Sequence, residues 1–362
     1  MKKISIELCI SLLILSTSCS KDASHNMVSK AAETVVTEER TTETPETEET
    51  EGIKNTVEET VETETEAANV PPLSESIEIT VQDGTATAGF GSLYTVINLS
   101  FYGADAENAL KEASDLIGIM SNTLNTAGAE DDQDHLRIPA KEYSGDIKEL
   151  IDIANEYSSE TNNYFSLEIL DDNSVDTLNI QDIYKGYMAN KISNELSNRS
   201  KEELSGALIS LGGNATIIGA KSNGKPWKIG IQDPNGEPGS YIAVVSVDKK
   251  YIESFNGTSL TVASKGTYSL SNNNNRVIDP ETGQIADSGI VASTVISSDA
   301  ALADAYGSAA IVMGHDKAVE FWKESNDNFE MVLVDKNKNI YVTEGLKDNL
   351  KSDSKYSLIT KE

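Results

Sequence analysis

The sequence predicts an α+β fold, with one domain of mixed sheets and helices behind an exported, disordered, acidic linker. Strand-like alternation of apolar and polar residues is interleaved with apolar residues at helical spacing, without a regular βαβ period. The stretch from Ser74 to Leu350, roughly 275 residues, is long enough for one large domain. Before it, residues 31–66 hold 13 glutamates against Arg40 and Lys54. Such a segment has too little apolar surface to offset chain entropy, so we expect no core there.

Each element of the domain is predicted from its own periodicity. Alternating or β-rich runs predict strands at Ser76–Val81, Leu93–Tyr102, Ala207–Leu211, Ala215–Ala220, Trp227–Gln232, Ile242–Val247, Glu330–Asp335 and Ile340–Thr343, the last two as a closing hairpin. Helical spacing predicts helices at Ala104–Thr123, Asp146–Ser159, Ile183–Leu196, Lys201–Leu204, Ser298–Gly314 and Ala318–Ser325. In the first helix, Ala109, Ala113 and Leu116 share one face. Ser298 or Asp299 is the expected N-cap of the helix that ends at Gly314.

Charge and residue usage exclude several classes of function. The net charge is −30, whereas nucleic-acid binding needs a basic surface, so no nucleic acid is expected as a partner. The two cysteines, Cys9 and Cys19, both lie near the N-terminus, so the rest of the chain has no disulfide framework, Cys-ligated zinc or thiol nucleophile. We therefore expect chemistry based on oxygen ligands, backbone amides and hydroxyls.

The N-terminus has the pattern of an export signal. Lys2 and Lys3 precede the apolar run Leu8–Leu15, and small residues lead into Cys19. The run is too short to span a bilayer. It resembles a bacterial lipobox, which predicts a signal peptide at 1–18, a lipidated Cys19 and an extracytoplasmic protein anchored to the cell membrane. The alternative is an ordinary cleaved signal with an incidental cysteine.

The segments that flank the domain are polar. Residues 19–73 are predicted to be a solvated Glu/Thr-rich linker, with an acidic binding tail as the alternative. The folded domain is predicted at 74–350, and a polar tail at 351–362.

A glycine pair and a lysine could bind phosphate. Ser210-Leu211-Gly212-Gly213-Asn214 lies between two predicted strands, and consecutive amides at paired glycines can bind an anion. A tight turn between strands is the alternative. Lys185 opens a predicted helix, where it could reach a phosphate or simply be solvated.

Asp304 and Ser308 stand four residues apart, which places a carboxylate and a hydroxyl on one face of a helix. Hard oxygen ligands suit Mg²⁺, which completes its shell with water and substrate phosphate oxygens. The alternative is a solvated aspartate near a helix N-terminus.

Taken in chain order, these motifs resemble the ApbE-type flavin transferases, over about Phe90 to Val334. Gly224–Pro234, after the glycine pair, is close to the central segment of that family. Ile278–Gly283 is similar to its Ile-Asp-Pro-x-Thr-Gly, and Ala303-Asp304-Ala305 with Ser308 to its metal-binding helix. Lys185-Gly186-Tyr187 matches its Lys-Gly-Tyr, and Phe90-Gly91-Ser92 takes the place of its early Met-Gly-Thr.

The resemblance implies an activity and a site. The activity is Mg²⁺-dependent transfer of FMN from FAD, the substrate, to a threonine or serine of an exported acceptor protein, releasing AMP. The implied residues are Tyr184 (through its carbonyl), Asp304 and Ser308 for the metal, Phe90, Asn179, Lys185, Gly212, Gly213, Asn214 and Ile278 for FAD, and Arg276 and Asp279 for catalysis.

The sequence departs from the family at this site. Asn179 replaces an aspartate, Gln181 and Asp182 replace two glycines, Tyr184 replaces an alanine, Arg276 a histidine and Ser308 a threonine. The resemblance therefore leaves a second function open, that of a non-catalytic flavin-binding or interaction lipoprotein. A solute-binding or structural surface lipoprotein is the third.

Overall fold

The computed structural model describes residues 71–131, 136–169, 177–221, 223–237, 239–267 and 276–361. Within these ranges a ten-stranded sheet is the largest unit. Its strands run in the order β1 (Ile79–Gln82), β2 (Thr85–Ser92), β3 (Thr95–Tyr102), β7 (Gly206–Leu211), β8 (Asn214–Gly219), β11 (Ser259–Gly266), β12 (Ile290–Ser297), β13 (Phe329–Asp335), β14 (Ile340–Thr343) and β16 (Ser357–Ile359). Neighbouring strands are antiparallel except β14 and β16, which are parallel.

Two short sheets and six α-helices complete the described part. One sheet contains β15 (Leu350–Lys351), β10 (Tyr241–Val247) and β9 (Trp227–Gln232), and the other β4 (Glu130–Asp131), β5 (Leu136–Pro139) and β6 (Thr177–Asn179). The helices are α2 (Ala106–Ala127), α3 (Gly145–Glu160), α4 (Tyr184–Leu196), α5 (Lys249–Ser254), α6 (Ala300–Met313) and α7 (His315–Glu324). Short 3₁₀ turns, η3 (Leu73–Glu75) and η4 (Glu344–Leu346), lie near the two ends.

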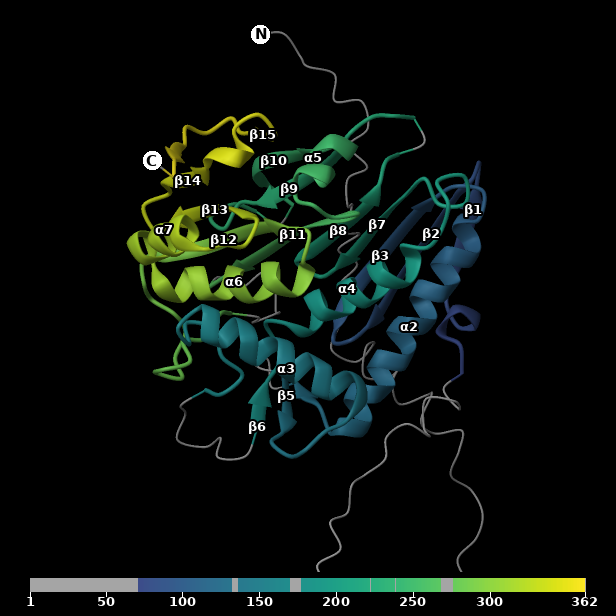
Figure 1. Cartoon of the computed structure of the whole chain (residues 1–362), viewed down its shortest axis with the longest axis horizontal. Helices are drawn as coiled ribbons and strands as arrows, with labels where there is room; N and C mark the ends of the chain where they lie inside the picture. The colour runs from purple at the N-terminus through teal and green to yellow at the C-terminus, as the bar shows by residue number, and fades with distance from the viewer. Residues whose placement is uncertain are drawn as a thin grey trace, which may run out of the picture. The chain divides into compact units, whose positions relative to one another are not determined.

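The large sheet separates two hydrophobic cores. Helices α2, α4, α6 and α7 cover one face, and the small sheet with α5 lies on the other (Figure 1). Side chains alternate along a strand, so β11 serves both cores: Leu260 and Val262 join the core under the small sheet, while Ala263 faces the helices. By the same alternation Lys265 is placed on the helix side.

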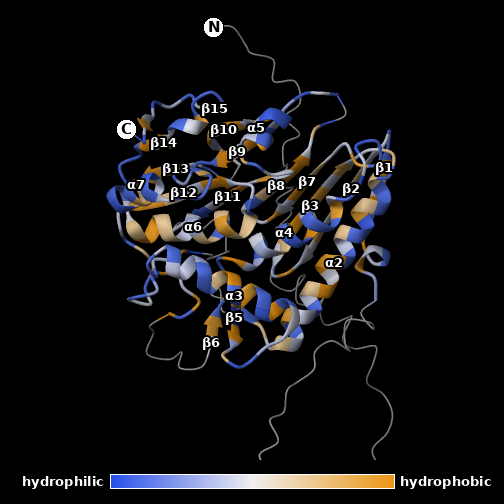
Figure 2. Cartoon of the chain, in the orientation of Figure 1, coloured by the Kyte–Doolittle hydropathy of each residue, from blue (hydrophilic) through white to orange (hydrophobic). Residues whose placement is uncertain are grey.

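Helix α6 runs through the interior of the domain. Every residue from Ala300 to Ile311 is buried, and most of the helix lies in the hydrophobic half of the colour scale in Figure 2. A helix that is apolar on all sides is stable only when it is covered on all sides. Asp299 is its N-cap, as predicted, because its carboxylate accepts hydrogen bonds from the amides of Ala301 and Leu302.

The predicted fold class is confirmed, while individual elements differ. The closing hairpin forms as β13 and β14. The prediction of a helix at Lys201–Leu204 is wrong, since its first three residues form a turn. Strands β2, β11, β12 and β16 of the large sheet were not predicted. None of the helices in the described ranges is both long and apolar enough to cross a membrane.

Candidate functional site

The start of α4 lies in direct contact with α6, and a glycine makes this possible. A Cβ atom at Gly186 would be 2.2 Å from the carbonyl oxygen of Ala300, so no other residue fits without moving a helix. The amide of Gly186 donates a hydrogen bond of 2.8 Å to Oδ2 of Asp304. The predicted Lys-Gly-Tyr motif and the predicted metal helix are therefore brought together.

Asp304 is fully buried and paired with a lysine that the sequence did not single out. Nζ of Lys265, on β11, lies 2.5 Å from Oδ1 of Asp304 and 3.4 Å from Oδ1 of Asp182. The Lys265 side chain is only 9% exposed. Burial alone would lower the pKa of Lys265, but Asp304 and Asp182 outweigh it and raise the pKa above its ordinary value. Lys265 is therefore held as an ammonium ion.

Lys185 is a second buried ammonium group in the same place. Its Nζ is 3.6 Å from where a Cβ of Gly212 would be, so the lysine reaches the turn between β7 and β8. Burial, followed by repulsion from Lys265, lowers the pKa of Lys185 to about 8, whereas Asp304 and Asp182 oppose the shift. An anion that entered here would relieve this repulsion.

The glycine pair forms a two-residue turn, with Leu211 opposite Asn214 in the strand register. Gly212 has a φ of +63°, which favours glycine. Its amide donates to the carbonyl of Val96 and is thus already used within the sheet, and a contact of Gly212 with FAD stays a prediction. The Gly213 amide has no backbone acceptor among the described residues, which leaves it available to a ligand.

Several buried polar atoms without a hydrogen-bond partner among the described residues lie on α6 and on the strands beside β11. They are Nδ2 of Asn214, Oγ of Ser293, Oγ of Ser308 and Oδ1 of Asp304, each in a side chain that is at most 2% exposed. Ser293 pairs directly with Lys265 across β11 and β12. Buried polar groups are rarely left unsatisfied, so these atoms indicate a site for a polar ligand.

Tyr184 fills space at the start of α4. Its ring is 1% exposed, and its hydroxyl donates a 2.6 Å hydrogen bond to the carbonyl of Leu93. Burial and the nearby Asp304 raise the pKa of Tyr184, so it stays neutral. The side chain is anchored rather than free to swing aside.

Residues 276–279 follow the end of β11. Val277 donates to the carbonyl of Gly266, which places Arg276 and Ile278 close to the strand that carries Lys265. Asp279 has a structural partner: Oδ1 accepts from the amide of Glu281. This carboxylate oxygen stabilises the turn, and the catalytic role of Asp279 stays a prediction.

Two predicted FAD-binding residues have local roles. Asn179 is buried in β6, where Oδ1 accepts from the amide of Gln181. Phe90 lies in β2 opposite Ile97 and packs against the helix-side core. Among the described residues, no hydrogen bond or ion pair joins either of them to Lys185 or Asp304. The predicted lipidation site, Cys19, lies outside the described residues.

The donors present do not fit a Mg²⁺ ion held by Asp304. Oδ2 accepts a hydrogen bond from the Gly186 amide, and Oδ1, which has no hydrogen-bond partner among the described residues, lies in an ion pair 2.5 Å from the Lys265 ammonium. Mg²⁺ requires a near-octahedral shell at about 2.0–2.1 Å from its ligands, in competition with that ammonium. No cluster of three or more His, Cys, Asp or Glu suited to a metal occurs in the described part of the chain. The Ser308 hydroxyl has no hydrogen-bond partner among the described residues and is the uncharged oxygen that this helix offers to a ligand.

Sequence reasoning missed Lys265, and it named Asp182 only as a departure from the family, without a role. The signal for Lys265 is local. Ser259–Gly266 is a strand that is mostly buried, and a lysine on its helix-facing side needs a carboxylate partner. Recognising this required the strand, which has a Ser/Thr-rich pattern, to be predicted first.

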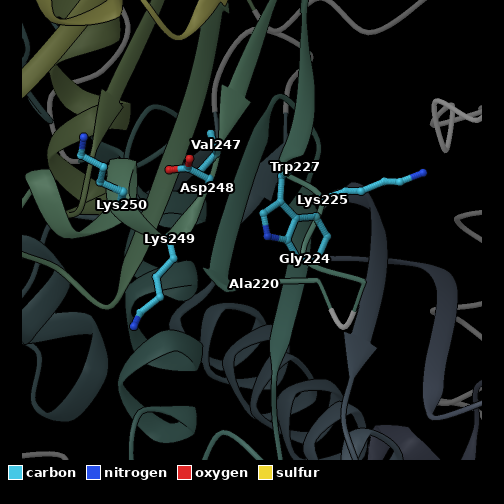
Figure 3. Close-up of a pocket in the computed structure, with 8 residues that line it drawn as sticks. All are labelled: Ala220, Gly224, Lys225, Trp227, Val247, Asp248, Lys249 and Lys250. Atoms are coloured by element: carbon cyan, nitrogen blue, oxygen red, sulfur yellow. The ribbon is translucent and has the colours of Figure 1, made fainter.

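A cavity of about 190 Å³ lies elsewhere, beside α5 and β9. Trp227 and the lysines Lys225, Lys249 and Lys250 line it, as Figure 3 shows. Drug-sized ligands occupy pockets of about 300–1,000 Å³, so this cavity is too small for a dinucleotide. It carries none of the predicted site residues.

Comparison with known proteins identifies what the chain resembles. The family model described as "ApbE family" matches residues 126–333, more than half of the chain. The FAD:protein FMN transferase of Klebsiella pneumoniae is 28% identical over 43% of this chain and 42% of its own length. That of Escherichia coli is 29% identical over 40% of this chain and 38% of its own length. The matched part of the chain thus spans less than half of these relatives.

Solved structures share the fold. The flavinyl transferase ApbE of Pseudomonas stutzeri, in its apo form, superposes with a TM-score of 0.53 at 15% identity, covering 75% of this chain and 99% of that one. The ApbE protein of Thermotoga maritima gives a TM-score of 0.55 at 18% identity, with 75% and 99% covered.

Proposed function

Because the chain belongs to the ApbE family, we propose that it transfers FMN from FAD to a threonine or serine hydroxyl of an exported protein. In this reaction the hydroxyl oxygen bonds to the FMN phosphorus and its proton is released to solvent. The bond from that phosphorus to the AMP oxygen breaks, and AMP leaves with the electron pair. Negative charge grows on the pyrophosphate oxygens as the bond breaks, so a catalyst must stabilise it.

The observation that carries the proposal is the pair of buried ammonium groups beside the glycine turn. Lys185, on α4, reaches Gly212, and Lys265, on β11, contacts Asp304 of α6. A buried ammonium group normally has an anionic partner. The pKa of Lys185 is lowered to about 8, first by burial and then by repulsion from Lys265, so this ammonium group lacks sufficient negative charge around it. A pyrophosphate bound there would pair with Lys185, and the Gly213 amide would supply a further donor.

The Mg²⁺ that the resemblance implies stays a prediction, and the ion pair of Asp304 with Lys265 argues against it. Arg276 stands where the family has a histidine, and a guanidinium group cannot accept the hydroxyl proton.

The test combines the full chain, FAD and the exported protein fraction of a bacterium that carries this chain. We expect a flavin-fluorescent protein band on a denaturing gel and release of AMP. Lys185→Met should abolish the band, whereas the exposed Lys250→Met should leave it unchanged. A wild-type chain that binds FAD yet labels no protein contradicts transfer.

That outcome would support the second candidate, a non-catalytic flavin-binding lipoprotein. Two observations favour it: Arg276 stands where the family has a histidine, and Tyr184 fills a position where the family has an alanine. FAD binding without transfer separates this candidate from the first.

We also propose that the chain acts outside the cytoplasm, anchored by lipid at Cys19. The apolar run and the small residues before Cys19 support this. One acyl chain gives marginal binding, and a second makes it stable.

A further inference from the structure

Lys265 lies where a metal ion bound to Asp304 would have to sit. Its Nζ is 2.5 Å from Oδ1 of Asp304, and its Cγ is 3.1 Å from where a Cβ of Gly307 would be. The aliphatic part of the lysine therefore runs along α6, and the ammonium group ends at the carboxylate. A residue larger than glycine at 307 would push this side chain away.

Two ammonium groups already lie near Asp304. Lys265 contacts Asp304 and Asp182, and Lys185 is attracted by these two carboxylates and by Asp131. A divalent cation would add two positive charges beside these ammonium groups in the interior, where unpaired charge is costly. It would also compete with an ammonium only 2.5 Å from its principal ligand.

Asp182 supports the same conclusion independently. It stands where the family has a glycine, and its Oδ1 lies 3.4 Å from Lys265 Nζ. The chain thus has both a lysine at Asp304 and a second carboxylate beside it. Together they form a built site for an ammonium group.

We propose that Lys265 is the resident cation of this site, holding Asp304 in place of a divalent metal and leaving Lys185 to pair with a bound phosphate. The identity of the phosphate as the FAD pyrophosphate rests on the proposed function, whereas the replacement of the metal does not. The site is then a metal-independent variant, with its cation fixed by the sequence.

The experiment titrates MgCl₂ and MnCl₂, with no flavin present, into the full chain by calorimetry. Wild type should show no saturable binding. Lys265→Ala frees Oδ1 of Asp304, beside the unpaired Ser308 hydroxyl, and should bind Mn²⁺ at least about tenfold more tightly than wild type. Asp304→Asn added to Lys265→Ala should remove this gain, and Lys250→Ala should behave as wild type.

The proposal is overturned if the wild type binds Mn²⁺ saturably and as tightly as Lys265→Ala does. It is also overturned if Lys265→Ala folds but binds Mn²⁺ no more tightly than the wild type. If Lys265→Ala does not fold, the spin-resonance signal of free Mn²⁺ is measured with the wild type and with Asp304→Asn. An undiminished signal with the wild type supports the proposal. A signal that the wild type reduces and Asp304→Asn does not reduce refutes it. A failure of FAD transfer leaves these flavin-free results unchanged, so the two claims fail separately.

Discussion

Removing the ammonium group of Lys265 should destabilise the fold strongly. Lys265→Met keeps the apolar stem but leaves the Asp304 carboxylate, which is 0% exposed, with only the Gly186 amide as a partner. Breaking a buried ion pair on one side costs about 3–5 kcal/mol of the free energy of unfolding, because the remaining charge is uncompensated. We expect Lys265→Met to fall in this range at pH 7.

A double-mutant cycle separates the ion pair from the loss of packing. Asp304→Asn should also destabilise, because it leaves the Lys265 ammonium with only the more distant Asp182. The double variant should be more stable than the sum of the two changes predicts, by about 1–3 kcal/mol.

Urea unfolding followed by circular dichroism measures all four free energies. The exposed Lys250→Met is the control and should change the free energy of unfolding by less than about 0.5 kcal/mol. Because the pKa of Lys265 is raised in the fold, its stabilisation is complete below the ordinary value of 10.5 and is lost as the pH rises through the folded value. The cycle at pH 7 therefore records the charged pair. Two results would refute the reasoning: stability changes of the single variants that add up to that of the double variant, or a Lys265→Met variant as stable as the wild type.

Three further changes test other parts of the account. Gly186→Ala places a Cβ 2.2 Å from the carbonyl oxygen of Ala300 and should lower the free energy of unfolding, measured by thermal melting, by about 1–3 kcal/mol or more. Gly91→Ala meets no atom closer than 4.0 Å and should leave the stability nearly unchanged. Equal effects of the two changes would argue against close packing of α4 on α6. Burial lowers the pKa of Lys185 to about 8, so its positive charge is lost as the pH rises above that value, and FAD affinity measured by fluorescence should fall there. Lys185→Met should bind FAD at least about tenfold more weakly at pH 7 and should lose this pH dependence. A pH profile of FAD affinity that Lys185→Met leaves unchanged would exclude Lys185 as the phosphate partner. Cys19→Ala should move the protein from the membrane to the soluble fraction on cell fractionation, and a variant that stays with the membrane would contradict lipid anchoring.

Local pattern predicted what local sequence controls. The helix predicted at Asp146–Ser159 is α3 with one residue more at each end, and the N-cap at Asp299 was among the two residues proposed. Strand β11 escaped prediction because serine, threonine and alanine on its covered face weaken the apolar alternation. Those small residues are tolerated because the buried helix α6 packs directly on them.

The site was predicted in part, for a related reason. Lys185, Asp304 and the glycine turn were chosen from motifs, and the fold brings them together. The pairing of Asp304 with Lys265 could not be derived, since the two residues lie on a helix and a strand whose packing depends on the whole domain. Likewise, the use of the Gly212 amide by Val96 depends on the position of β3.

Titration of FAD into the full chain, once in EDTA and once in excess Mg²⁺, tests most directly that the lysines of this site recognise the pyrophosphate. Each calorimetric experiment is run at pH 7, where Lys185 and Lys265 are charged. The account predicts saturable binding with the same affinity in both solutions. Binding that requires Mg²⁺, or no binding in either solution, would contradict it.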